Sequence, residues 1–241
     1  MTSTQHNIES VNQLINPDNI IESINQLAKA FQGKVVFSTS FSWEDQIIAH
    51  TIFKHHIDVA VFTLDTGRLF AETYATWSRT LELYQQKITA YYPDANQLQD
   101  FIVNKGPNSF YESIENRKQC CYIRKVAPLQ RALKDKAIWI TGIRAAHSNG
   151  RSDMPLLEYD QANDIIKYHP LLHWTTEEVI TFINQNNIPY NPLHDNGFIS
   201  IGCMPCTRAV SAGEDFRAGR WWWEDNSKKE CGLHVHRANE Q

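Results

Sequence analysis

KVVFSTSFSWED, at positions 34–45, is the stretch of sequence that decides the fold. Its first part, Lys34–Ser38, is a short apolar run of the buried-strand type. The polar turn Thr39–Ser42 follows, and the carboxylates of Glu44 and Asp45 favour a helix that starts there. Strand, turn and helix in this order predict the first unit of an α/β domain. The backbone N–H groups of such a turn can hold a phosphate, but the turn has neither glycine nor lysine and is not a Walker A loop.

Strands and helices continue to alternate along the chain. Further strands are expected at 58–64, 88–92 and 137–141, with helices at 68–86, 94–105 and 113–133. One or two helices over 8–31 precede the first strand, and a hairpin (155–159, 165–168) and a helix at 175–186 follow the last. This order predicts an open, mostly parallel sheet with helices on both faces. Ligands bind outside the carboxyl ends of such strands, so the polar turns 38–45, 64–67 and 141–144 are expected to border one pocket.

Composition excludes several classes of protein. The chain has 241 residues, of which 42% are hydrophobic, enough for a sizeable core. Its formal net charge of −4 argues against a broad nucleic-acid-binding surface. Because no apolar run approaches membrane-spanning length and nothing resembles a secretory signal, we expect a cytoplasmic protein with reduced thiols and no membrane partner. Five cysteines, an odd number, argue against a disulfide framework and leave metal binding or catalysis.

Four of the cysteines have metal-ligand spacing. Cys120-Cys121 and the Cys203-x-x-Cys206 pair supply four thiolates, which suit a structural zinc or an iron–sulfur cluster. Adjacent thiolates are awkward for one tetrahedral zinc but can bind different irons, so the vicinal pair favours a [4Fe–4S] cluster. The alternative is that Cys120 and Cys121 pack in a helix as small hydrophobic residues. Lys125, one helical turn beyond Cys121, is expected to approach the cluster or an anionic substrate, unless it is a solvated surface lysine.

Cys231 is the remaining thiol. The neighbouring residues Lys228 and Lys229 favour its thiolate and Glu230 opposes it, which makes it a candidate nucleophile or an incidental cysteine of the tail. His234 lies three residues further on and can donate to an anion.

Several arginines can bind phosphate or sulfate through their fork of donors, unless they form ordinary surface salt bridges. Arg217 and Arg220 have i, i+3 spacing, so on a helix they would face the same way. Arg144, Arg151 and Arg208 are the other candidates in this group.

Four segments closely resemble the bacterial assimilatory adenylyl-sulfate (APS) reductases: residues 120–126, 202–206, 213–224 and 229–234. The likeness extends from about Val35 to the end of the chain. It implies the adenine-nucleotide α-hydrolase fold shared with ATP pyrophosphatases, a [4Fe–4S] cluster on Cys120, Cys121, Cys203 and Cys206, and Cys231 as the catalytic nucleophile. The resemblance and the donor chemistry together give these expected substrate-binding residues: Ser38, Ser40, Ser42, Leu64, Asp65, Gly67, Lys125, Gly142, Arg144, Arg151, Arg217, Arg220 and His234.

The resemblance also implies a reaction. The Cys231 thiolate would attack the sulfur of APS, AMP would leave, and reduced thioredoxin, a separate protein, would release sulfite from the resulting S-sulfonate. Relatives that reduce 3′-phosphoadenylyl sulfate (PAPS) usually lack the four cluster cysteines, so the cysteines favour APS. PAPS reduction remains an alternative, as does a nucleotide-binding metal-sensing module, which would leave Cys231 without a task. An ATP-using relative would be expected to keep a glycine-rich Ser-Gly-Gly loop.

The expected organisation has three parts. An N-terminal helical segment occupies residues 1–33, and a nucleotide-binding α/β domain that carries the iron–sulfur site occupies 34–220. A mobile catalytic tail occupies 221–241.

Overall fold

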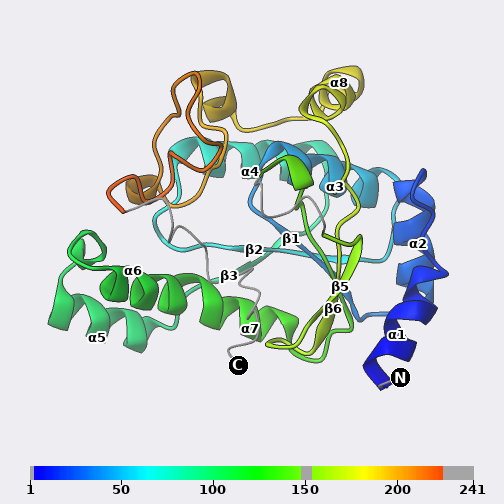
Figure 1. Ribbon diagram of the computed structural model, residues 1–241, viewed down its shortest axis with the longest axis horizontal. Coiled ribbons are helices and arrows are strands. Elements are labelled where there is room, and N and C mark those ends of the chain that lie inside the picture. Colours follow the sequence, from blue (N-terminus) through cyan, green and yellow to red (C-terminus); the bar gives the residue numbers. More distant parts are fainter. Residues whose placement is uncertain (1–2, 148–153, 225–241) are drawn as a thin grey trace.

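A six-stranded sheet forms the middle of the molecule (Figure 1). The computed structural model describes residues 3–147 and 154–224. The strands are β1 (Val35–Thr39), β2 (Ala60–Leu64), β3 (Thr89–Tyr91), β4 (Ile138–Ile140), β5 (Leu157–Asp160) and β6 (Ile165–Tyr168). They lie in the order β3-β2-β1-β4-β6-β5, and only β5 runs antiparallel to its neighbour among the described strands. The predicted open, mostly parallel sheet is confirmed.

Helices cover both faces of this sheet, also as predicted. They are α1 (Ser3–Asn12), α2 (Ile20–Ala30), α3 (Trp43–Lys54), α4 (Ala71–Tyr84), α5 (Ala95–Lys105), α6 (Ile114–Cys121), α7 (Ala127–Leu133) and α8 (Thr176–Asn186). Figure 1 shows α3 and α4 on one side of the sheet and α5, α6 and α7 on the other. Within the described residues, no helix is long and apolar enough to cross a membrane.

The two faces follow from the period-two pattern of the strands. Val35 and Phe37 of β1 belong to the larger hydrophobic cluster, which includes Ile48 of α3. Val36, between them, belongs to a second cluster with Leu129 of α7. Successive side chains of a strand point to opposite faces, so an uninterrupted apolar run fits a strand that is covered on both sides.

Register brings the polar turns to one edge. β1 pairs in parallel with both β2 and β4, with Ser38 opposite Phe62 and Phe37 opposite Ile140. The turns that follow these three strands therefore leave the sheet at the same edge. This is the edge at which ligands bind in open α/β sheets.

A π-helical turn interrupts the helix predicted over 113–133. Residues Tyr122–Val126 form this turn between α6 and α7, directly after the cysteine pair. The wider turn changes the direction in which the following side chains point, so Lys125 is not placed by the ordinary helical spacing assumed in the sequence analysis. Single π-helical turns occur often at functional sites.

The segment that carries Arg217 and Arg220 is not a helix. It consists of turns, with the N–H of Ala218 donating to the carbonyl of Asp215 at 2.9 Å and that of Arg220 donating to Arg217 at 2.9 Å. Two contacts close it into a loop: the Arg208 N–H donates to the carbonyl of Gly219 at 3.0 Å, and that of Trp221 to Cys206 at 3.2 Å. The premise of a shared helical face was therefore wrong, although both arginines line one cavity, as shown below.

Candidate active site

A cavity of about 240 Å³ opens at the carboxyl ends of β1, β2 and β4. All three polar turns contribute to its wall, which confirms that they border one pocket. From the first turn come residues 38–42 with Glu44 and Asp45, from the second Leu64 and Thr66, and from the third Thr141, Gly142 and Ile143. Residues from later in the chain also line it: Ile199, Ser200, Ile201, Gly202, Phe216, Arg217 and Arg220.

Side-chain hydrogen bonds hold the first turn in place without glycine. Both the N–H and the hydroxyl of Ser40 donate to Asp45 Oδ2, at 2.6 and 2.7 Å. Phe41 has a φ of 63°, in the left-handed region that bulky residues rarely adopt. Its N–H donates to Thr39 Oγ1 at 3.1 Å, and its fully buried ring stacks on Trp77 at 5.6 Å between centroids. Burial of the ring and the local hydrogen bonds offset the backbone strain of this position.

Asp45 is a carboxylate enclosed in the cavity wall. Asp45 is 5% exposed, and burial raises the pKa of its carboxyl to about 6, although the two hydrogen bonds from Ser40 oppose the shift. The third turn approaches it closely, because a Cβ added at Gly142 would overlap Asp45 Oδ1. A glycine is therefore required at position 142 by the space that the carboxylate occupies.

Predicted substrate-binding residues of the first two turns divide into two groups. Ser38, Ser40, Ser42 and Leu64 line the cavity. Asp65 and Gly67 do not: Asp65 Oδ1 accepts hydrogen bonds from the Gly67 N–H and the Tyr74 hydroxyl, both at 2.8 Å. These two residues shape the turn after β2 instead of facing the cavity.

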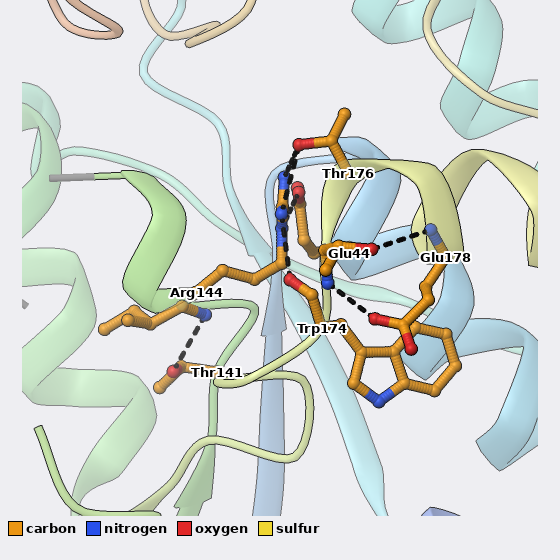
Figure 2. Close-up of polar contacts among 8 residues, drawn as sticks. Glu44, Thr141, Arg144, Trp174, Thr176 and Glu178 are labelled. Carbon is orange, nitrogen blue, oxygen red and sulfur yellow. Dashed lines mark hydrogen bonds and ion pairs between the residues drawn. The ribbon is translucent and has the colours of Figure 1, made fainter. Parts of the chain in front are cut away.

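Arg144 does not line the cavity either, and Figure 2 shows its side chain among Glu44, Trp174 and Thr176. Its side chain is 1% exposed, and its Nε donates to Glu44 Oε1 at 2.7 Å in a buried ion pair. Its Nη1 donates to the carbonyl of Trp174 at 3.1 Å and to Thr176 Oγ1 at 3.3 Å. The guanidinium thus ties the third turn to α3 and to the start of α8, and Gly142 and Ile143 form the part of this turn that lines the cavity.

Three cations also line the cavity: Lys125, Arg217 and Arg220. The Arg220 guanidinium lies 4.8 Å from the centroid of the Trp221 ring, and its Nε is buried without a hydrogen-bond partner in the described part of the chain. A Cβ at Gly202 would overlap this guanidinium, so the arginine occupies space that only glycine leaves open. The cavity therefore offers cationic donors to an anion.

The four cysteines of the predicted cluster gather around a second, smaller hollow. Cys120, Cys121, Cys203 and Cys206 line a space of about 20 Å³. Within the described residues, no group of three or more His, Cys, Asp or Glu side chains is arranged to hold a single metal ion. Lys125 lines both this hollow and the cavity. The two sites are therefore neighbours that share one cation.

The surroundings of the cysteines are strongly charged. Burial raises the pKa of Cys203, but the Lys125 ammonium and a 3.2 Å hydrogen bond with Thr66 Oγ1 outweigh it, so that the net pKa is lowered. Burial raises the pKa of Cys206 to about 12, and the neighbouring thiolates of Cys203 and Cys121 add to this shift. The thiolate of Cys203 is thus favoured, and its negative charge disfavours ionisation of Cys206.

Sequence reasoning missed two features of this region. Arg124 is 5% exposed, lines the cysteine hollow and donates from Nη1 to the carbonyl of Thr66. Residues 199–201, which were not among the predicted site residues, also line the cavity. The position of Arg124 next to Lys125, between the apolar residues Ile123 and Val126, was a usable signal for its role. The position of residues 199–201 follows from tertiary folding and had no local signal.

Three predicted site residues, Arg151, Cys231 and His234, lie outside the described residues. Their proposed roles rest on the sequence.

Comparison with known proteins places this geometry in a family. The sequence model of the phosphoadenosine phosphosulfate reductase domain matches residues 34–209. Adenosine 5'-phosphosulfate reductase of Sinorhizobium fredii (strain NBRC 101917 / NGR234) is 46% identical over 209 residues, which cover 87% of this chain and 83% of the relative. The protein of the same name from Allochromatium vinosum is 43% identical over 214 residues, or 89% of this chain and 83% of the relative.

Solved structures show the same fold. A phosphoadenylyl-sulfate (PAPS) reductase from Candida auris, in a phosphate complex, superposes with a TM-score of 0.70 at 26% identity, over 87% of this chain and 99% of that chain. An FMN adenylyltransferase from Candida glabrata reaches a TM-score of 0.51 at 16% identity, over 90% and 73% of the two chains. The latter shares the fold alone.

Proposed function

We propose that this chain, which belongs to the phosphoadenosine phosphosulfate reductase domain family, reduces adenosine 5'-phosphosulfate to sulfite and AMP in sulfate assimilation. The observation that carries the proposal is the position of Lys125, which lines both a cavity with two arginines and a hollow with four cysteines. A nucleotide cavity alone would fit many members of this fold. A nucleotide cavity directly beside a four-cysteine site is what we expect of a protein similar to the relatives named as APS reductases.

The cavity suits the phosphosulfate group of APS. Ser40 and Ser42 present a polar turn, and Arg217, Arg220 and Lys125 bring positive charge. Arginine forks match the oxygens of phosphate and sulfate, and the low-dielectric wall strengthens these interactions. AMP leaves as an anion, so the same cations would stabilise the charge that develops on its phosphate oxygen.

The cysteine hollow fits a [4Fe–4S] cluster. Each thiolate of such a cluster binds its own iron, so its four ligands need not have the spacing that a single ion demands. Cys120, Cys121, Cys203 and Cys206 would be the ligands, and Arg124 and Lys125 line the hollow where they would offset the negative charge of the thiolates. When bound, the cluster would supply a fixed negative charge beside Lys125 and hold α6 to the loop of Cys203.

Cys231 is the proposed nucleophile. Its thiolate attacks the sulfur of APS: the S–S bond forms, the S–O bond to AMP breaks, and the electron pair of that bond leaves with AMP. A thiolate of reduced thioredoxin then attacks Cys231 Sγ and sulfite departs with the pair of the S–S bond. The second thioredoxin thiolate resolves the mixed disulfide, so the dithiol supplies the two electrons that the reaction consumes.

Thioredoxin is proposed as a separate protein, and the cytoplasm as the compartment, because five cysteines in an odd number suit a reducing environment. A bound phosphosulfate must be attacked where water is excluded, and thioredoxin must later reach the same sulfur. We propose that the segment 221–241 serves both steps as a catalytic tail.

Product analysis tests the function. The purified chain, reduced thioredoxin and either APS or PAPS are incubated in parallel, and sulfite and the nucleotide product are measured. The proposal expects sulfite and AMP with a higher kcat/KM for APS. Equal or better turnover of PAPS would reassign the substrate, in keeping with the resemblance to the Candida auris enzyme.

Iron and acid-labile sulfide in equal amounts are expected in protein purified without oxygen; stoichiometric zinc without sulfide would exclude the cluster.

A further inference from the structure

A buried ion pair holds the end of the described chain to the cysteine-bearing helix. Arg117 Nε and Nη2 donate to the two carboxylate oxygens of Glu224, both at 2.8 Å. The two side chains are 2% and 4% exposed. A bidentate pair of this kind fixes both the distance and the orientation of its partners.

Arg117 lies on α6, directly before the cysteines. Cys120 and Cys121 follow it at i+3 and i+4, so one short helix presents the ion pair and two of the proposed cluster ligands. Glu224 is the last residue of the part of the chain that the structure describes. The pair thus attaches the beginning of the tail to the scaffold of the cysteine site.

Trp221 connects this pair to the substrate cavity. The Arg117 guanidinium lies 4.7 Å from the centroid of the Trp221 ring, and those of Arg220 and Arg217 lie 4.8 and 5.9 Å from it. The indole is 1% exposed and packs in one cluster with Cys120, Cys203 and Cys206. The two arginines that line the cavity and the arginine that holds Glu224 therefore share one aromatic ring.

Burial of a charged pair is a poor way to gain stability. The desolvation of both ions offsets much of their attraction, and apolar residues of similar volume often serve the fold equally well. The buried pair at this position is therefore better explained by the geometry that it fixes than by a gain in stability. Cys231 is seven residues beyond Glu224, a span of at most about 25 Å for an extended chain. The point of attachment therefore sets which places the thiol can reach.

We propose that Arg117 and Glu224 are positioning residues for the first chemical step: they fix the position and direction in which the tail leaves the domain, and so align the Cys231 thiolate with the sulfur of APS. The inference rests on the proposed function. Neither residue lines the cavity, so the pair acts through the tail and not through contact with the nucleotide.

Tether length alone gives a small effect, which makes the proposal testable. If the pair is removed, the next fixed point is Trp221, ten residues before Cys231 instead of seven. Effective concentration falls with about the −3/2 power of tether length, so this change alone slows the reaction by only about twofold. Loss of alignment costs about 10- to 100-fold. The size of the loss therefore separates the two cases.

The experiment uses the double variant Arg117→Met/Glu224→Met, because removal of one charge would leave the other buried and unpaired. The matched control is Arg208→Met/Glu214→Met, which removes a bidentate pair from the same region that is 38% and 33% exposed. Three quantities are measured for each protein: iron content, the Kd of AMP, and the rate of AMP release from APS in a single turnover without thioredoxin.

The proposal expects the Arg117/Glu224 variant to release AMP at least about tenfold more slowly, with unchanged iron content and AMP affinity, and the control to match the wild type. A loss below about threefold, or a loss shared by AMP affinity and iron content, overturns it in favour of a purely structural pair. A wild-type chain that releases no AMP from APS overturns the proposed function, and the inference with it.

Discussion

Asp45→Asn is expected to stabilise the protein at neutral pH but much less at pH 5. Asp45 is a buried carboxylate whose Oδ2 accepts two hydrogen bonds from Ser40. An asparagine side-chain oxygen can accept the same two hydrogen bonds, so the substitution removes the titration and preserves the contacts with the first turn. The difference between the two proteins then reports the cost of the buried charge.

The sign of this effect follows from the direction of the pKa shift. Burial raises the pKa of Asp45 from 3.8 to about 6, so between these values the folded protein binds the proton that the unfolded chain has lost. The contribution of Asp45 to the free energy of unfolding therefore falls as pH rises from about 3.8 to 6 and is flat above. At about 1.4 kcal/mol for each pKa unit, the whole decrease is about 3 kcal/mol. Roughly half of it, about 1 to 2 kcal/mol, falls between pH 5 and pH 7.5.

Thermal unfolding at pH 5 and pH 7.5 measures this difference. The gain in Tm of the variant over the wild type should be larger at pH 7.5 than at pH 5 by roughly 2 to 8 °C. Asp18→Asn, at an exposed aspartate, is the matched control and should show no such difference. If Asp45→Asn shifts Tm equally at the two pH values, the carboxyl does not titrate in this range and the reasoning is refuted.

Three further predictions test the cavity and the tail. Gly142→Ala should lower the stability by about 1 to 3 kcal/mol and weaken AMP binding, because the added Cβ overlaps Asp45; unchanged Tm and Kd would show that the turn adjusts freely. Arg217→Lys and Arg220→Lys should each lower kcat/KM for APS about tenfold or more with iron content unchanged, because charge remains but the fork is lost, and wild-type kinetics in both would remove them from the site. Cys231→Ser should bind AMP and retain iron but release no AMP from APS, whereas wild-type protein should carry a sulfonate that mass spectrometry maps to Cys231; a sulfonate on another cysteine would contradict the mechanism.

The fold could be predicted because its signals are local. The run at 34–38 contains three consecutive apolar residues, as expected for a strand that is covered on both faces. In the structure, Val35 and Phe37 are buried on one face of the sheet and Val36 on the other. Alternation of strands and helices then determines a parallel sheet, and the sheet determines which turns meet. Each step needs only the sequence and a general rule of chain geometry.

The site could be predicted only where the type of residue by itself indicates the chemical role. Cysteines are few, so their spacing alone gathered four of them correctly around one hollow. Arginine is ambiguous, because the same guanidinium serves a ligand or a buried carboxylate. Arg144 follows a strand in the expected place, yet Glu44, a residue of the same wall, takes its Nε donor. No local pattern distinguishes that arginine from Arg220, whose Nε is left for a ligand.

The buried charges of this chain explain why the distinction is hard. Arg117 and Arg144 each bind a buried glutamate that is far away in the sequence, whereas Arg220 and Lys125 line the cavity. A cavity that binds an anion needs cations whose charge is not already offset by the carboxylates nearby. The two arginine–glutamate pairs serve that purpose: Arg144 offsets the charge of Glu44, which lines the cavity, and Arg117 offsets the charge of Glu224. Arg117 and Arg144 therefore offset the charge of two buried glutamates, and Arg217, Arg220 and Lys125 give the cavity its positive charge.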